Sequence, residues 1–301
     1  MLPPLRKPVG ALILSAKPEE KSEVTKIVTE YFSREDPLLD GFATFTLPAN
    51  SAGVEEALVL ADCGQMGNVA AASRTGYLLA AFRPNLTIFV GTAGSLRPDK
   101  CTVYDVVVPT LGVIAKYYDK LEDAGGYCLW GGAKPESTAG LAAFTKDRKR
   151  YTLRRKDKTL EHIGFGTSFV TEAKTRDEQG TGLDVGLKSG KGVSRTPRVH
   201  LDTYIFSWEK VVASGHYQTL LAKDLDTKAY AVDMESFGFL SAFAQFQKLV
   251  GGNERSSLIV RGISDVCGDK SGSYDEGRND IATRNAATVA CRILRDGYLK
   301  L

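Results

Sequence analysis

The sequence predicts an α/β fold, because short apolar, β-branched runs alternate with segments of helical periodicity. The runs that we expect to be strands cover residues 9–14, 56–61, 86–90, 103–108, 229–232 and 258–260. Residues 18–32 and 68–82 are expected helices, and the first of them opens with a proline where no amide hydrogen is needed. The clearest helix lies near the C-terminus, where small and branched apolar residues between 282 and 293 form one stripe that would end near Gly297.

Size and composition favour one domain over residues 1–301. The chain has 301 residues, of which 43% are hydrophobic and 25% charged, and no linker-like segment interrupts it. The composition changes at about 131–197, which we interpret as a basic insertion into that domain. Within it, residues 146–158 carry eight lysines and arginines against two aspartates. Charge runs usually face water, so a solvated hairpin is the favoured interpretation and a phosphate-binding element is the alternative.

Composition also argues against several classes of protein. No apolar run is long enough to span a bilayer and the first four residues lack a signal-peptide pattern, so we expect a cytoplasmic protein with no membrane partner. The five cysteines are scattered and odd in number, and with only three histidines we expect no disulfide framework, no metal and no cofactor. The net charge of +3 is too small and too diffuse to argue for nucleic acid by itself, and we expect no nucleic-acid partner.

The first of three strand ends that could carry chemistry follows residues 86–90. Ligands of α/β sheets gather at the carboxyl ends of strands. Here the strand runs into Gly91, Thr92, Ala93 and Gly94, and glycines at such a point let a ligand approach the backbone closely. A tight turn after any strand would look similar, so this segment becomes informative only together with the others.

The other two strand ends carry acids. The strand at 229–232 leads into Met234 and Glu235, and an ionised carboxylate can accept hydrogen bonds from both hydroxyls of a sugar diol. An acid that interacts with the dipole of the following helix is the alternative for Glu235. The strand at 258–260 leads into Ser264 and Asp265, and a carboxyl group in an apolar pocket can keep a proton and give it to a leaving group. An aspartate that caps the next turn is the alternative there.

In their combination and order, the three strand ends resemble the nucleoside phosphorylase and nucleosidase superfamily, and within it the methylthioadenosine/S-adenosylhomocysteine nucleosidase type. Residues 10–20 are similar to the first strand and acidic turn of these enzymes, and residues 63–71 to their glycine-rich turn before an alanine-rich helix. The resemblance extends from about residue 9 to 294, with the basic insertion as the main unmatched block. It implies a three-layer α/β/α phosphorylase-type fold with a central mixed sheet, and a homo-oligomer.

The resemblance also implies an activity, hydrolysis of the N-glycosidic bond of a purine nucleoside or nucleotide, with adenine as the expected base. Glu20 would position the attacking water, and Asp265, supported by Ser264, would protonate the purine at N7. Glu235 would hold the ribose hydroxyls, with Met234 beneath the sugar. Further substrate contacts are implied for Thr92, Ala93, Gly94, Val211 and Val212.

Two positions bear on the choice between water and phosphate. Phosphorylases of the superfamily resemble one another in placing an arginine where this chain has Phe89, and a phenyl ring cannot pair with a phosphate dianion. Trp208 stands where glycine is usual, which puts the shape of that loop in doubt and would fill space. Hydrolysis is therefore the prediction. A phosphorolytic enzyme and a non-catalytic nucleoside-binding regulatory protein remain alternatives, and the 5′ group is open between hydroxyl, thioether and phosphate.

Overall fold

The structure is a computed structural model, and it describes residues 7–35, 41–49, 53–123, 151–160, 167–190, 193–251, 255–267 and 276–296. Contacts divide the chain into two compact units. The larger comprises Met1–Ile114 together with Leu160–Leu301, and the smaller comprises Ala115–Thr159. The prediction of a single domain with an insertion at about 131–197 stays a prediction.

The larger unit is built on a mixed sheet, whose path of hydrogen-bonded neighbours runs β2-β3-β4-β1-β5-β11-β10. Strand β5 is its centre, because it pairs in parallel with β1 and β12 and in antiparallel with β11. Two short strands extend the sheet beyond β12, since β6 pairs with β12 and β9 pairs with β6. The strands are β1 (Val9–Ser15), β2 (Ser33–Arg34), β3 (Ala43–Thr46), β4 (Ala57–Asp62), β5 (Leu86–Ser95), β6 (Val106–Val107), β9 (Val199–His200), β10 (Tyr204–Ser207), β11 (Ala229–Asp233) and β12 (Ser256–Val266).

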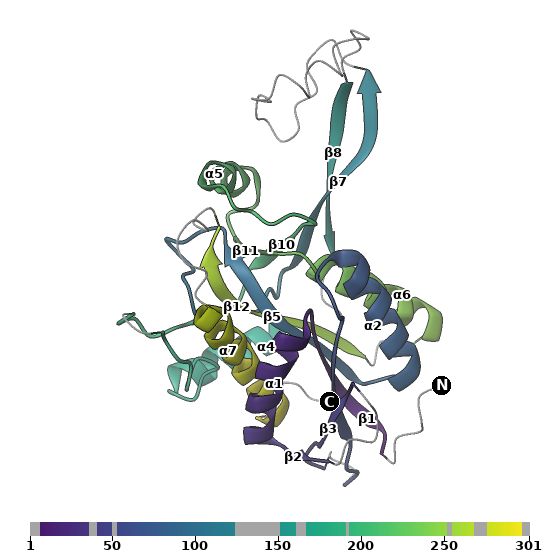
Figure 1. The fold of residues 1–301 in the computed structure, drawn as a ribbon. Coiled ribbons are helices and arrows are strands. Elements are labelled where there is room, and N and C mark those ends of the chain that lie inside the picture. The colour runs from purple at the N-terminus through teal and green to yellow at the C-terminus, as the bar shows by residue number, and fades with distance from the viewer. Residues whose placement is uncertain are drawn as a thin grey trace. The chain divides into compact units, whose positions relative to one another are not determined.

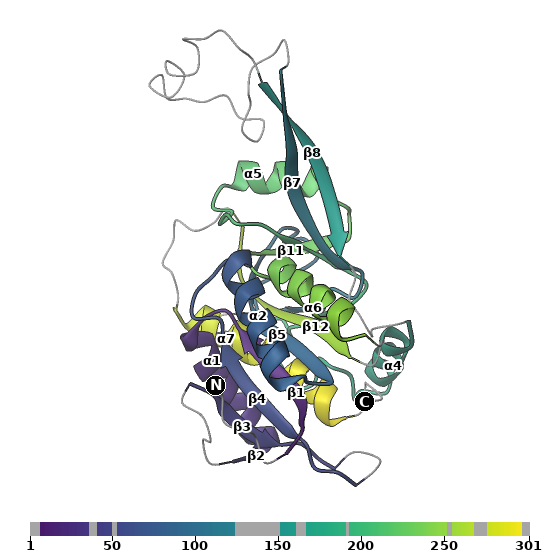
Figure 2. The same ribbon diagram turned by 90° about the vertical axis from the view of Figure 1, so that its right-hand side faces the viewer.

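Helices cover both faces of this sheet, which confirms the predicted three-layer α/β/α fold. Figures 1 and 2 show α1 and α7 packed together on one face and α2 and α6 on the other. Both pairs bury apolar stripes against strands that are themselves almost entirely buried. The helices of this unit are α1 (Pro18–Tyr31), α2 (Asn68–Phe82), α4 (Thr167–Glu178), α5 (Gly215–Asp224), α6 (Ser236–Val250) and α7 (Glu276–Arg295).

Helix α7 lies unusually close to β12, and a glycine makes this possible. A Cβ atom at Gly262 would lie 1.9 Å from the carbonyl oxygen of Ala282. Any larger residue there would push the helix away from the strand. The beginning of α7 is thereby held beside the carboxyl end of β12, where two of the predicted site residues lie.

A strand lies within or over each run expected from the sequence, but the run at 103–108 forms only the two-residue β6, whereas the two central strands are much longer than their apolar runs. Strand β5 continues through the glycine turn to Ser95, and β12 continues to Val266, because the two pair with each other along their whole length. Hydrogen bonding between neighbours therefore keeps Gly91–Gly94 in extended conformation, where the sequence alone indicates a turn.

The smaller unit contains most of β7 (Gly112–Asp123) and β8 (Tyr151–Leu160), which hydrogen-bond to each other. Of the basic run at 146–158, residues 146–150 lie outside the described residues and the rest belong to β8. Its proposed roles therefore stay predictions. Within the described ranges, every helix is too short or too polar to cross a membrane.

Candidate active site

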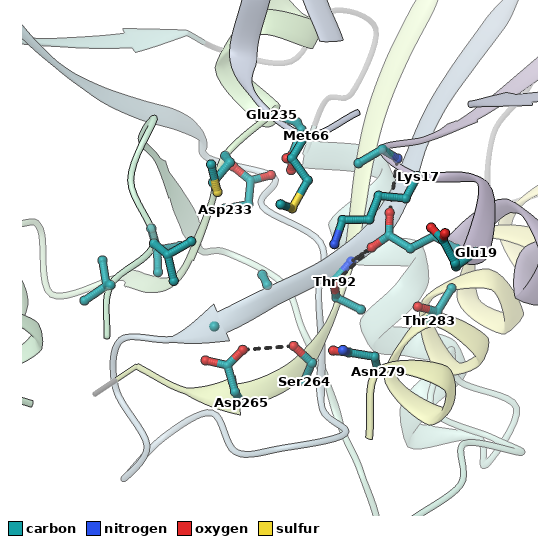
Figure 3. Close-up of a pocket in the computed structure, with 18 of the residues that line it drawn as sticks. Lys17, Glu19, Met66, Thr92, Asp233, Glu235, Ser264, Asp265, Asn279 and Thr283 are labelled. Carbon is teal, nitrogen blue, oxygen red and sulfur yellow. Dashed lines mark hydrogen bonds between the residues drawn. The ribbon is translucent and has the colours of Figure 1, made fainter. Parts of the chain in front are cut away.

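A cavity of about 640 Å³ opens in the larger unit, where β5, β11 and β12 end and where α1 and α7 begin. Figure 3 shows side chains from all of these elements facing it. Every residue that the sequence predicted as catalytic or substrate-binding lines this cavity: Glu20, Thr92, Ala93, Gly94, Val211, Val212, Met234, Glu235, Ser264 and Asp265. Segments as far apart as residues 20 and 265 thus meet at one place, although their individual roles stay predictions.

Glu20 lies in the first turn of α1 and its carboxylate is fixed by three hydrogen bonds. Its Oε1 accepts from the backbone N–H of Thr92 at 3.1 Å and from the Thr92 hydroxyl at 3.0 Å. Its Oε2 accepts from the N–H of Ala16 at 3.1 Å. The contacts aim the carboxylate at the end of β5, and they leave lone pairs for a water molecule in the cavity.

Ser264 and Asp265 are consecutive, yet both line the cavity. In a regular strand, neighbouring side chains point to opposite faces. Here the register of β12 against β5 shifts between Ile263 and Asp265, and such an irregularity turns side chains towards a site. The Ser264 hydroxyl donates a hydrogen bond to Oδ2 of Asp265 at 3.1 Å, as Figure 3 shows.

Gly94 leaves the room that Asp265 needs. A Cβ atom at Gly94 would lie 2.7 Å from Sγ of Cys267 and 3.1 Å from Oδ1 of Asp265. The close approach of β5 to the acid explains why a glycine stands at this position of the strand.

Glu235 is buried, with 5% of its surface exposed, and its titration is strongly shifted. Burial, followed by the negative charge of Asp233, raises the pKa of Glu235 to about 7. Its Oε1 accepts a hydrogen bond from the N–H of Gly67 at 3.1 Å. Gly67 belongs to the glycine-rich turn before α2. Glu235 therefore gains or loses a proton near neutral pH. Shifted pKa values of this kind are typical of residues in functional sites.

Arg261 is the most important neighbour that sequence reasoning missed. It is completely buried in β12, and its Nε donates to Oδ2 of Asp233 at 2.9 Å. Its Nη2 lies 3.7 Å from Oε2 of Glu235. Burial lowers the pKa of Arg261, but the negative charges of Asp233, Glu235 and Glu20 outweigh this effect and raise it. An arginine within an apolar strand is itself a signal, because a charged residue is rarely buried unless it is paired.

Arg261 also bears on the prediction that Phe89 leaves this part of the site without a cation. The Phe89 ring stacks on Phe239 with centroids 5.1 Å apart, and the Arg261 guanidinium lies 4.2 Å from the Phe89 centroid. A cation therefore lies at the place where the sequence indicated none. It is held against Asp233, however, and does not line the cavity.

Trp208 does not fill the site as we expected. It does not line the cavity, but it stacks on Tyr217 with ring centroids 5.5 Å apart and packs on the apolar cluster around Phe206. The neighbouring Val211 and Val212 line the cavity, with 52% and 5% of their surfaces exposed. The loop after β10 therefore offers the cavity an apolar edge that suits a planar base.

The cavity has a second set of lining residues that the sequence did not indicate. They come mainly from the beginnings of α1 and α7 and from the loops after β4 and β10, and most of them are polar. The set comprises Ala16, Lys17, Glu19, Glu23, Met66, Lys210, Val232, Asp233, Cys267, Asn279, Asp280 and Thr283. No pattern in the sequence marks α7 residues as neighbours of Glu20, because only the packing of α7 on β12 brings them there.

Among the described residues, one group of side chains could in principle hold a metal ion: Cys101, Asp105 and His200. Asp105 is already saturated, because it accepts hydrogen bonds from His200 Nε2 at 2.9 Å, from Arg195 Nη2 at 3.1 Å and from two backbone N–H groups. Burial raises the pKa of the Cys101 thiol well above its usual value, which disfavours the thiolate that a metal requires. We therefore assign this group a structural role.

Comparisons with known proteins agree with this geometry. Residues 14–130 match the family model of the phosphorylase superfamily, whereas no curated protein sequence matches the chain. The structure is similar to the methylthioadenosine/S-adenosylhomocysteine nucleosidase of Helicobacter pylori, with a TM-score of 0.57 and 19% identity over 96% of this chain and 98% of that one. It is also similar to the S-adenosylhomocysteine nucleosidase of Streptococcus pyogenes, with a TM-score of 0.58 and 16% identity over 96% and 97%.

A third similar structure is the futalosine hydrolase of H. pylori strain 26695, with a TM-score of 0.55 and 18% identity over 93% of this chain and 94% of that one. At such identities the likeness establishes the fold, over nearly the whole of each chain. The resemblance indicated by the sequence is thus confirmed: this chain carries the phosphorylase-superfamily match in residues 14–130 and has the fold of the methylthioadenosine/S-adenosylhomocysteine nucleosidases.

Proposed function

We propose that this protein is a nucleosidase, which hydrolyses the N-glycosidic bond of a purine nucleoside. The observation that carries the proposal is the meeting of Glu20, Glu235 and Asp265 around one cavity. A shared fold alone does not determine activity, so the argument rests on the chemistry of these side chains. The names of the similar structures, which describe nucleosidases and a hydrolase, point the same way.

Cleavage of the bond between sugar and base separates charge. Positive charge develops on the ribose carbon and negative charge on the departing base. In the proposed mechanism, Asp265 donates its proton to N7 of the purine, so that the base leaves as a neutral molecule. The hydroxyl of Ser264, 3.1 Å from Oδ2, holds the acid in position.

The two glutamates act on the sugar side. Glu235 in its ionised form accepts hydrogen bonds from the ribose hydroxyls, and its negative charge stabilises the cationic sugar. Glu20 orients a water molecule and takes its proton as the oxygen bonds to the ribose carbon. One water is consumed, and the products are the free base and free ribose carrying the original 5′ substituent.

The charge of the cavity favours water over phosphate as the acceptor. Two lysines line the cavity, Lys17 and Lys210, whereas the acids that line it are Glu19, Glu20, Glu23, Asp233, Glu235, Asp265 and Asp280. A phosphate dianion would meet net negative charge in this lining, which would repel it. Arg261 does not reverse this balance, because its charge is matched by that of Asp233.

Adenine is the base that we propose, by analogy with the similar structures, one of which is a nucleosidase from Colwellia psychrerythraea in complex with adenine. A homo-oligomer and a cytoplasmic location stay predictions. The experiment is to incubate the purified protein with adenosine, methylthioadenosine, S-adenosylhomocysteine and AMP, with and without phosphate. Chromatography then measures the released base and identifies the sugar product.

Each outcome has a defined meaning. Release of adenine together with free ribose, independent of phosphate, supports hydrolysis. Ribose 1-phosphate that forms only when phosphate is present would show a phosphorylase instead. Tight binding of a nucleoside without release of base would show a non-catalytic binding protein, the third interpretation that the sequence left open.

A further inference from the structure

One wall of the cavity is not used by the proposed reaction. The base and sugar are assigned to the ends of β11 and β12 and to the loop after β10. Apart from Glu20, which acts on the water, the remaining wall comes from the residue before α1 and from the N-terminal parts of α1 and α7. It presents polar side chains: Lys17, Glu19, Asn279, Asp280 and Thr283. A substrate whose base and ribose lie against the other residues would direct its third part, the 5′ substituent, at this wall.

Lys17 is the distinctive residue of this wall. It is the residue immediately before α1, and Figure 3 shows its side chain running into the cavity. Two lysines of α1 form ion pairs with protein carboxylates: Lys21 with Asp62 at 2.9 Å, and Lys26 with Glu23. Among the described residues, by contrast, the Lys17 ammonium forms no ion pair or hydrogen bond, and only the backbone oxygen of Lys17 accepts hydrogen bonds. A cation directed into a cavity without a protein partner is available for a ligand.

We propose that Lys17 is a specificity-determining residue that binds an anionic group on the 5′ side of the nucleoside. The inference rests on the proposed function, because that function assigns the base and the ribose to the other walls. An apolar methylthio group at this place would cover the ammonium without pairing with it, which costs free energy. A carboxylate or phosphate would instead form a charge-assisted hydrogen bond.

Two kinds of substrate supply such a group: a 5′ amino-acid tail, through its carboxylate, and a nucleotide, through its 5′-phosphate. The neighbouring acids favour the former. Glu19 and Asp280 are exposed on the same wall and could accept the ammonium of an amino-acid tail, whereas they would repel a phosphate dianion. Pairs of substrates that differ only in the amino-acid tail or only in the 5′-phosphate distinguish these two possibilities.

The test compares Lys17→Met with the unaltered protein. S-adenosylhomocysteine and methylthioadenosine share the sulfur and differ in the amino-acid tail, and AMP and adenosine differ in the phosphate. We expect the substitution to lower kcat/KM for the substrate with the anionic tail about tenfold, since a hydrogen bond to a charged group has this order of effect. The value for its neutral partner should stay within about threefold. Lys248→Met, at an exposed lysine of α6, is the matched control.

Binding measurements keep this inference separate from the proposed activity. Calorimetric titration of the same four compounds needs no turnover, and it can be repeated in Asp265→Asn to prevent cleavage. A loss of affinity for one anionic compound in Lys17→Met supports the inference and identifies its tail, even if no base is released. Equal losses for charged and neutral partners, no loss, or no binding of any compound would overturn it.

Discussion

The two walls of the cavity are built differently. On the wall assigned to base and sugar, Asp233 and Glu235 are each 5% exposed, and the completely buried Arg261 contacts both of them without lining the cavity itself. On the wall assigned to the 5′ substituent, Glu19 is exposed and Lys17 extends into the cavity without a partner among the described residues. A buried, interlocked network suits groups that must keep one geometry during a reaction. Side chains that hold nothing else in place can change with the substrate at little cost to the fold.

The sharpest test of the reacting wall is Asp265→Asn. The amide keeps the shape of the side chain but cannot donate a proton as an acid, so we expect kcat to fall about 10²- to 10⁴-fold. The thermal unfolding temperature should stay close to that of the unaltered protein. Assays of base release, with circular dichroism as the control for folding, measure both. Turnover that survives the substitution would show that another group protonates the base.

The two walls should also differ in how much a substitution there lowers the free energy of unfolding. In Arg261→Met, Asp233 and Glu235 would remain buried without their cation, and breaking a buried pair in this way costs about 3–5 kcal/mol. Lys17→Met should change stability by less than about 0.5 kcal/mol, as surface substitutions usually do. Urea unfolding of both variants, followed by fluorescence, gives the two free energies. Similar values for the two would mean that the walls do not differ as the structure indicates.

The sequence indicated Ser264, Asp265, Met234 and Glu235 as cavity residues because they follow recognisable strands. Apolar runs that end in Ser264–Asp265 and in Met234–Glu235 can be found without a structure, and the rule that ligands gather at strand ends brings them together. The three-layer fold followed from the resemblance and was confirmed. The length of β5 was not predicted, because pairing with β12 extends it through glycines whose local preference is a turn.

Other features could not be predicted, and the physical reasons differ. The shift of register at Ile263 depends on the partner strand, so the sequence does not show that Ser264 and Asp265 face the same way. Lys17 precedes a proline and a helix, a pattern that fixes its backbone but not the direction of its side chain. Arg261 was detectable in principle, since a charge inside an apolar run requires a buried partner.

The raised pKa of Glu235 predicts a pH dependence of binding that arises on the buried wall. With a pKa of about 7, Glu235 is mainly protonated below neutrality and mainly ionised above it. Only the ionised form accepts hydrogen bonds from both ribose hydroxyls, so affinity should rise about tenfold from about pH 6 to about pH 8. Calorimetry with adenosine in Asp265→Asn measures this. A 2′,3′-dideoxy analogue, which lacks the diol, should show a flat profile, and an equal slope for both ligands would contradict the assignment.

The smallest effect is expected at Thr92, which joins the two walls because it lies on β5 and holds Glu20 of α1. Thr92→Val removes the hydroxyl that lies 3.0 Å from Oε1 but keeps the backbone N–H, which lies 3.1 Å from the same oxygen. Losing one of several hydrogen bonds should reduce kcat about fivefold. Thr92→Ser keeps the hydroxyl and should retain most of the activity. If Thr92→Ser lost as much activity as Thr92→Val, the hydrogen bond would not explain the effect, because serine keeps the hydroxyl that lies 3.0 Å from Oε1. If the effect appeared in KM alone, Glu20 would contribute to binding and not to the activation of water.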